Sequence, residues 1–168
     1  LHSKVLPVLP SAFDAGQAIE EVVHNAKLSA EVKGLGLRYV RPAEIVALNT
    51  DPALFRTVVG NLIDNAVKFT DRGEVEVSVE PRSDAVRVEV RDTGPGVPAS
   101  ERARIFEPFA HLESADSKHT PGVGLGLAMV REVMHMLGGT VEVQSEVGVG
   151  SRFSITLPFA TEPTPTND

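Results

Sequence analysis

Apolar residues recur at the spacing of an α-helix in three stretches of the chain, at positions i, i+3, i+4, i+7 and i+8. Asp14 is placed to cap the first stretch, and Asp51-Pro52 opens the second with an N-cap residue followed by proline at the first helical position. Gly138-Gly139 follows the third, where glycine favours a helix C-terminus. The predicted helices are residues 15–28, 52–66 and 125–137.

Alternating apolar and polar residues predict β-strands in the rest of the chain. The predicted strands are residues 35–40, 45–48, 75–79, 86–90, 140–145 and 151–157. Turn residues at 81–84 and 148–150 join the last four strands into two antiparallel pairs. Because the strands form mostly such pairs, with helices between them, the sequence predicts an α+β fold: a two-layer α/β sandwich whose mixed, mostly antiparallel sheet packs on about three helices.

Four segments fall outside this pattern. Residues 1–13 predict an irregular N-terminal linker, and residues 100–106 a short helix. Residues 111–122, HLESADSKHTPG, are polar and predict a mobile loop. Residues 161–168 predict a disordered tail. The predicted domain is therefore residues 14–160.

Composition narrows the possible functions. The 168 residues are 42% hydrophobic and 23% charged, which fits one globular domain. A formal net charge of -7 argues against nucleic acid as a partner. The absence of cysteine excludes a disulfide, a thiolate metal site and a cysteine nucleophile. With no apolar run of about 20 residues and no signal-peptide pattern, we expect a cytoplasmic segment without membrane contact. A first residue of Leu1 suggests a piece of a longer parent protein, which could itself be membrane-anchored.

Three polar side chains share a narrow stripe of the second predicted helix. Asn61, Asn65 and Lys68 are spaced i, i+4 and i+7, so they fall beside its apolar face. Amide oxygens suit Mg²⁺ and lysine suits phosphate, which indicates a metal-phosphate clamp. A solvated helix face is an equally good interpretation of this stripe alone.

Two glycine-rich segments and an aromatic pair add to this pattern. Residues 122–127, GVGLGL, precede a predicted helix, where free N–H groups favour an anion, although a flexible hinge explains them equally well. Residues 92–98, DTGPGVP, follow a predicted strand and indicate at least a tight turn. Residues 105–109, IFEPF, predict core packing at the base of the polar loop. An anchored base and a mobile middle are what a lid requires.

These segments, in this order, resemble the motifs of the catalytic and ATP-binding domain of sensor histidine kinases in two-component systems, a member of the GHKL superfamily. NLIDNAVKFT at 61–70 is similar to the N box, DTGPGVP to the first glycine box, IFEPF to the F box and GVGLGL to the second glycine box. The similarity runs from about Asp14 to Phe159. It implies a Bergerat-type sandwich, with ATP between the helices and a flexible lid.

The resemblance also implies residue roles. Asn65 would bind Mg²⁺ and Lys68 would contact phosphate as the catalytic pair, while Asn61 would support the metal-phosphate region. Asp92 would accept a hydrogen bond from the adenine amino group. The other implied ATP-binding residues are Phe69 over the base, Gly94 and Gly96 in the adenine pocket, Gly122, Gly124, Leu125, Gly126 and Leu127 around the phosphates, and Ser151.

The implied enzyme is a protein-histidine kinase with ATP and Mg²⁺ as cofactors. Hydrolytic relatives activate water with a Glu at the position of Asn61, and an amide has no useful basicity, so transfer to a protein nucleophile is favoured. None of the five histidines precedes Glu or Asp, as the family's acceptor usually does. We therefore expect the acceptor in a separate dimerisation domain upstream of Leu1, with a response regulator receiver domain as the next partner.

Two other functions stay open. The chain has Ala110-His111 where many relatives carry Tyr-Arg after the F box, which slightly favours a nucleotide-binding regulatory module without transfer. Lys118 or His119 could supply the missing positive charge. The second alternative is a serine-directed kinase of the anti-sigma-factor type from the same superfamily.

Overall fold

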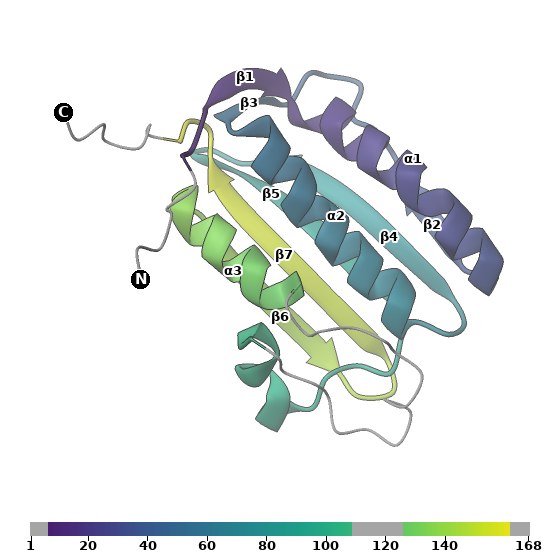
Figure 1. Ribbon diagram of the computed structural model, residues 1–168. Coiled ribbons are helices and arrows are strands. Elements are labelled where there is room, and N and C mark those ends of the chain that lie inside the picture. Colours follow the sequence, from purple (N-terminus) through teal and green to yellow (C-terminus); the bar gives the residue numbers. More distant parts are fainter. Residues whose placement is uncertain (1–6, 109–125, 162–168) are drawn as a thin grey trace.

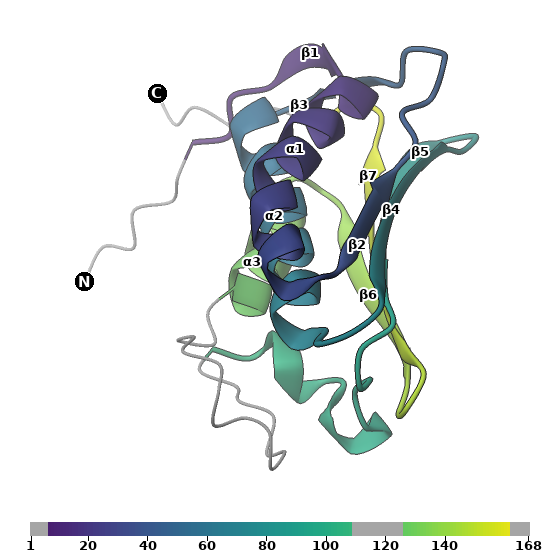
Figure 2. The same cartoon turned by 90° about the vertical axis from the view of Figure 1, so that its right-hand side faces the viewer.

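Three helices lie across one face of a five-stranded sheet in the computed structural model, which describes residues 7–108 and 126–161 (Figure 1). Figure 2 shows that the helices form one layer and the sheet the other. The elements are β1 (Ser11–Asp14), α1 (Ala15–Lys33), β2 (Gly36–Tyr39), β3 (Ala47–Thr50), α2 (Pro52–Phe69), β4 (Glu74–Pro81), β5 (Ala85–Asp92), the 3₁₀ turns η1 (Ala99–Glu101) and η2 (Arg104–Phe106), α3 (Gly126–Met136), β6 (Thr140–Glu146) and β7 (Gly150–Pro158). The predicted α+β sandwich is confirmed.

The sheet has the strand order β2-β4-β5-β7-β6. β2 runs parallel to β4, and the other three neighbouring pairs are antiparallel. The sheet is therefore mixed and mostly antiparallel, as predicted, and the expected β4–β5 hairpin is present. β1 and β3 form a separate two-stranded antiparallel sheet.

The core lies between the sheet and α2, the middle helix of the three (Figure 1). Alternate residues of β4 and β5 are apolar from Val75 to Val79 and from Val86 to Val90, so one face of the hairpin is buried against the apolar face of α2. The fully or almost fully buried side chains include Phe55, Val58, Val59, Leu62, Ile63, Val75, Val77, Val86, Val88 and Val90. This packing fixes α2 relative to the strand end at Asp92.

Both predicted N-caps are present. The Asp14 carboxylate accepts a hydrogen bond from Gly16 N at 3.0 Å, and the Asp51 carboxylate accepts from Ala53 N and Leu54 N at 3.0 and 3.1 Å. The first helix is longer than predicted, because residues 29–33 contain no breaker and Ala30 extends the buried face. It ends at Gly34, which adopts the left-handed conformation with φ 72°.

Two segments differ from the prediction. Ser11–Asp14 forms β1 instead of irregular chain, because its backbone pairs with β3, a partner that a local pattern does not reveal. Residues 99–106 form η1 and η2 instead of one helix, in a segment where neither turn has a side-chain cap. The predicted loop at 111–122, most of the predicted tail and residue 125 of the third predicted helix lie outside the described residues.

Within residues 7–108 and 126–161, none of the helices combines the length and the apolar character that a membrane crossing requires.

Candidate functional site

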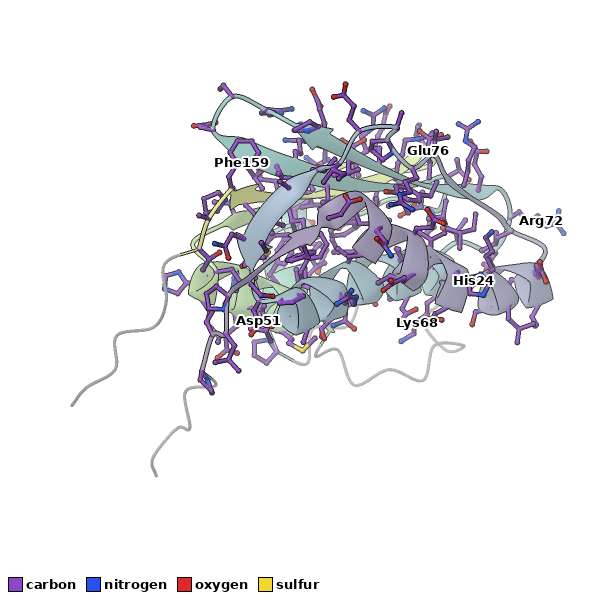
Figure 3. The ribbon with its side chains drawn as sticks, turned by 90° about the horizontal axis from the view of Figure 1, so that it is seen from above. His24, Asp51, Lys68, Arg72, Glu76 and Phe159 are labelled. Atoms are coloured by element: carbon purple, nitrogen blue, oxygen red, sulfur yellow. The ribbon has the colours of Figure 1, made fainter. Side chains whose placement is uncertain are left out.

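The predicted site residues that the structure describes gather at one end of the two layers. The last turn of α2, the end of β5 and the β6–β7 turn all lie at the lower end of the molecule in Figures 1 and 2. In Figure 3, Asp51 and Lys68 mark the two ends of α2, and Lys68 lies at the site end. A cleft of about 340 Å³ at this end includes Asp92 and Ser151 in its wall. A larger groove of about 620 Å³ lies between α1 and β2 and contains none of the predicted site residues.

Asp92 is the last residue of β5 and is only 8% exposed. Its Oδ1 accepts a hydrogen bond from Gly94 N at 2.9 Å, which holds the carboxylate at the start of the turn. Burial raises the pKa of Asp92, while the amides of Gly94 and Ser151 and the charge of Arg91 act in the opposite direction. The turn residue predicted from DTGPGVP is thus a buried carboxylate held by backbone amides.

Two glycines make this turn possible. A Cβ on Gly94 would lie 3.1 Å from both Asp92 Oδ1 and Thr70 Oγ1, so a side chain would press on both oxygens. Gly96 has φ 77°, and a Cβ there would overlap the carbonyl of Glu146. The turn after β5 therefore lies against both the end of α2 and the β6–β7 turn.

Ser151 is paired with Asp92 across β5 and β7 and is buried. Its Oγ lies 2.8 Å from the Oγ of Ser145 on β6. The Ser145 Oγ also accepts a hydrogen bond from Val97 N at 2.6 Å and donates one to Gly150 O at 3.0 Å. Because that proton is already used, Ser151 is the donor to Ser145. Ser145 thus fastens the turn after β5 to the β6–β7 hairpin. Sequence reasoning missed it, since one serine in a polar stretch gives no signal.

Thr70 is the second residue that sequence reasoning missed. It follows α2 as the C-cap, is fully buried, and its Oγ1 has no hydrogen-bond partner among the described residues. Its hydroxyl lies beside Gly94, at the wall of the turn that holds Asp92. The only available signal was its position as the last residue of NLIDNAVKFT.

Asn61, Asn65 and Lys68 are all half-buried on α2. Within the described part of the chain, Asn61 makes one weak side-chain contact, from Nδ2 to Met129 Sδ on α3 at 3.9 Å. Gly126, the first residue of α3, lies beside Asn65, since a Cβ there would be 3.6 Å from Asn65 Nδ2. Within the described residues, the side chain of Asn65 makes no hydrogen bond. The stripe therefore presents polar groups that remain available to a ligand.

Lys68 and Phe69 end α2. The Lys68 ammonium lies 5.6 Å from the centre of the Phe69 ring, and Phe69 is 38% exposed. Leu127 is partly buried against the core. Gly122, Gly124 and Leu125 lie outside the described residues, as do Ala110, His111, Lys118 and His119.

The aromatic pair of IFEPF is partly described. Ile105 and Phe106 of η2 are buried, and the Phe106 ring meets Phe153 of β7 edge-on with centroids 6.3 Å apart. The first half of the motif thus packs in the core, as predicted, and anchors the segment that leads to residue 108. Phe109 lies outside the described residues.

Relatives of this chain are sensor histidine kinases. It is 36% identical over 160 residues to sensor histidine kinase RcsC of Escherichia coli strain K12, covering 95% of this chain and 17% of RcsC. It is 38% identical over 160 residues to circadian input-output histidine kinase CikA of Synechococcus elongatus, covering 92% of this chain and 21% of CikA. The chain thus spans about a fifth of the length of these curated relatives or less.

Solved structures show the same fold. Full-length ShkA in complex with AMPPNP aligns with a TM-score of 0.82 and 32% identity, over 97% of this chain and 34% of ShkA. Residues 50–161 match the family described as histidine kinase-, DNA gyrase B-, and HSP90-like ATPase, a range that contains Asn61, Asn65, Lys68, Asp92 and Ser151. With two thirds of its length matched, the chain belongs to the family of histidine kinase-, DNA gyrase B- and HSP90-like ATPases.

Proposed function

We propose that this chain is the catalytic domain of a sensor histidine kinase: it binds Mg-ATP at the end of α2 and donates the γ-phosphoryl group to a histidine of a separate dimerisation domain. The observation that carries the proposal is that a buried carboxylate, Asp92 at the end of β5, and the half-buried polar stripe of α2 lie at the same end of the molecule, inside the range that matches one family. Its relatives RcsC and CikA are named as a sensor histidine kinase and a circadian input-output histidine kinase.

The residues fit a magnesium-nucleotide complex. Mg²⁺ prefers oxygen ligands and keeps several waters, so one protein amide together with phosphate oxygens suffices to hold it. The Asn65 amide is half-buried and makes no hydrogen bond among the described residues, so its oxygen is free for this role. Bound there, the metal would neutralise phosphate charge. Lys68 would bind phosphate as a point charge, and Asp92 would accept the adenine amino proton.

The transfer step needs little from the protein beyond position and charge. A neutral imidazole nitrogen of the acceptor attacks the γ-phosphorus, a P–N bond forms as the bond to the β,γ-bridging oxygen breaks, and ADP leaves. The imidazole then loses the proton from its other nitrogen. Asn61 supplies no base for water at this point, which favours transfer over hydrolysis. A response regulator aspartate would receive the group next.

Binding measurements test the proposal. Titration of the chain with ATP by calorimetry should show tighter binding with Mg²⁺ than with EDTA, and Asn65→Ala should lose most of this difference. Asn25→Ala is the matched control, because Asn25 is an exposed amide on α1 away from the stripe. Equal Mg²⁺ dependence in Asn65→Ala and the wild type would contradict the metal assignment.

A further inference from the structure

Lys33, the last residue of α1, reaches across to the end of α2. Its Nζ donates hydrogen bonds to Val67 O at 2.7 Å and Lys68 O at 2.9 Å, and it lies 3.7 Å from Asp71 Oδ1. The Lys33 side chain is 31% exposed, whereas that of Asp71 is 90% exposed. An exposed ion pair contributes little, so the two carbonyl contacts are the substantive ones.

These carbonyls belong to the last turn of α2, where no further helical N–H is available to them. The next amide, Thr70 N, bonds to Ala66 O at 3.1 Å and leaves the carbonyls of Val67 and Lys68 without backbone partners in the helix. A lysine ammonium satisfies both and also interacts favourably with the negative end of the helix dipole. Lys33 therefore caps α2 from another helix.

The position of Lys33 is itself fixed. Gly34 ends α1 in the left-handed conformation, and its N–H bonds to Glu31 O at 2.9 Å. Leu35 N bonds to Ala30 O at 2.9 Å and closes the same turn. Because the backbone on both sides is held, the Lys33 side chain starts from a defined point.

The capped turn carries the phosphate side of the proposed site. Lys68 is itself one of the two residues whose carbonyls Lys33 binds, and Thr70 follows against the turn that holds Asp92. We infer that Lys33 is a positioning residue for nucleotide binding: it holds the last turn of α2 so that the Lys68 ammonium stays directed at the phosphates. This inference rests on the proposed function.

The test compares ligands with and without phosphates. Calorimetry would measure the affinity of the chain for ATP, ADP and adenosine in Lys33→Met, Lys33→Arg and Lys27→Met. Lys33→Met should weaken ATP and ADP about fivefold, the scale of one ordinary hydrogen bond, with little change for adenosine. Lys33→Arg should restore most of the affinity because it keeps the donors and the charge. Lys27 is an exposed lysine on the same helix, so Lys27→Met should leave all three affinities unchanged.

Two results for Lys33→Met would overturn the inference while leaving the proposed function intact. One is an ATP affinity equal to that of the wild type. The other is an equal loss of affinity for ATP and adenosine, which would indicate a merely structural role. A wild-type chain that binds no adenine nucleotide would overturn both. If Lys33→Met unfolds at the assay temperature, Lys33→Gln decides, since it keeps an N–H donor without the charge. It should weaken ATP more than adenosine, and equal effects would count against the inference.

Discussion

The two halves of the site are built differently. Around Asp92, the Asp92 carboxylate and the Ser151 hydroxyl are buried and have protein partners, namely the amide of Gly94 and the hydroxyl of Ser145. On α2, Asn65 and Lys68 are half-buried and leave their polar groups available. The first arrangement suits recognition of a fixed shape, and the second suits charged groups that arrive with a ligand. Substitutions in the first half should therefore affect folding as well as binding, whereas substitutions in the second half should affect mainly binding.

Replacing glycines should separate the two halves most strongly. Gly150→Ala puts a Cβ onto the carbonyl of Asp92 at φ 146°, so we expect a loss of roughly 3 kcal/mol or more in the free energy of unfolding. Gly126→Ala, beside Asn65, meets nothing closer than 3.6 Å among the described residues and should be neutral or stabilising. Urea unfolding measures both.

Gly148→Ala is the control for backbone strain, since Gly148 has φ 84° but no atom of residues 7–108 and 126–161 lies within 4 Å of an added Cβ. It should fall between the other two variants. Similar losses in Gly126→Ala and Gly150→Ala would remove the contrast between the halves.

Asp92→Asn should change nucleotide choice. If the Asp92 carboxylate accepts the adenine amino proton, the variant should lose about tenfold or more in ATP affinity, the scale of one hydrogen bond to a charged group. GTP lacks that amino group at the same ring position, so its affinity should fall less. Competition binding with both nucleotides measures the ratio, and equal losses would argue against contact with the base.

The stability of the same variant should depend on pH. Burial raises the pKa of Asp92 in the folded chain, so the folded state binds more protons than the unfolded state. The contribution of Asp92 to stability is therefore greatest below its unfolded pKa and is lost as the pH rises through the folded pKa. Asp92→Asn should gain stability relative to the wild type at neutral pH, and that gain should shrink in acid. A stability gain of Asp92→Asn that grows in acid would contradict a raised pKa for Asp92 in the folded chain.

Thr70→Val should have the smallest effect. Its hydroxyl has no partner among the described residues, so an isosteric methyl group should change the free energy of unfolding by no more than about 0.5 kcal/mol. Thr50→Val is the matched control, because the buried Thr50 Oγ1 lies 2.6 Å from Thr161 Oγ1, and it should cost about 1 kcal/mol. A large loss in Thr70→Val would mean that the hydroxyl is bonded in solution.

Local patterns predicted the elements that local physics determines. The caps at Asp14 and Asp51 and the β4–β5 hairpin are properties of neighbouring residues, and all three are present. Strand β1 was missed because it forms by pairing with β3. The paired residues Asp14 and Ala47 are more than 30 positions apart in the sequence, so a local pattern does not reveal the pair.

The same distinction applies to the site. The stripe of α2 follows from helical spacing, and the role of Asp92 follows from resemblance, so both could be proposed from the sequence. The roles of Lys33 and Ser145 could not be proposed from the sequence. Val67, which Lys33 contacts, is 34 residues away, and Val97, which Ser145 contacts, is 48 residues away. Lysine and serine are common surface residues, and only the folded chain shows what these two contact.

The most direct test of the proposed function is transfer of labelled γ-phosphate from ATP to the acceptor domain of the parent protein, supplied separately. The wild-type chain with Mg²⁺ should label that domain with acid-labile phosphate, as expected for phosphohistidine, and Asn65→Ala should not. Undiminished labelling by Asn65→Ala would contradict the metal assignment. Acid-stable labelling would indicate a serine acceptor, and tight ATP binding by the wild type without any labelling would contradict the kinase assignment.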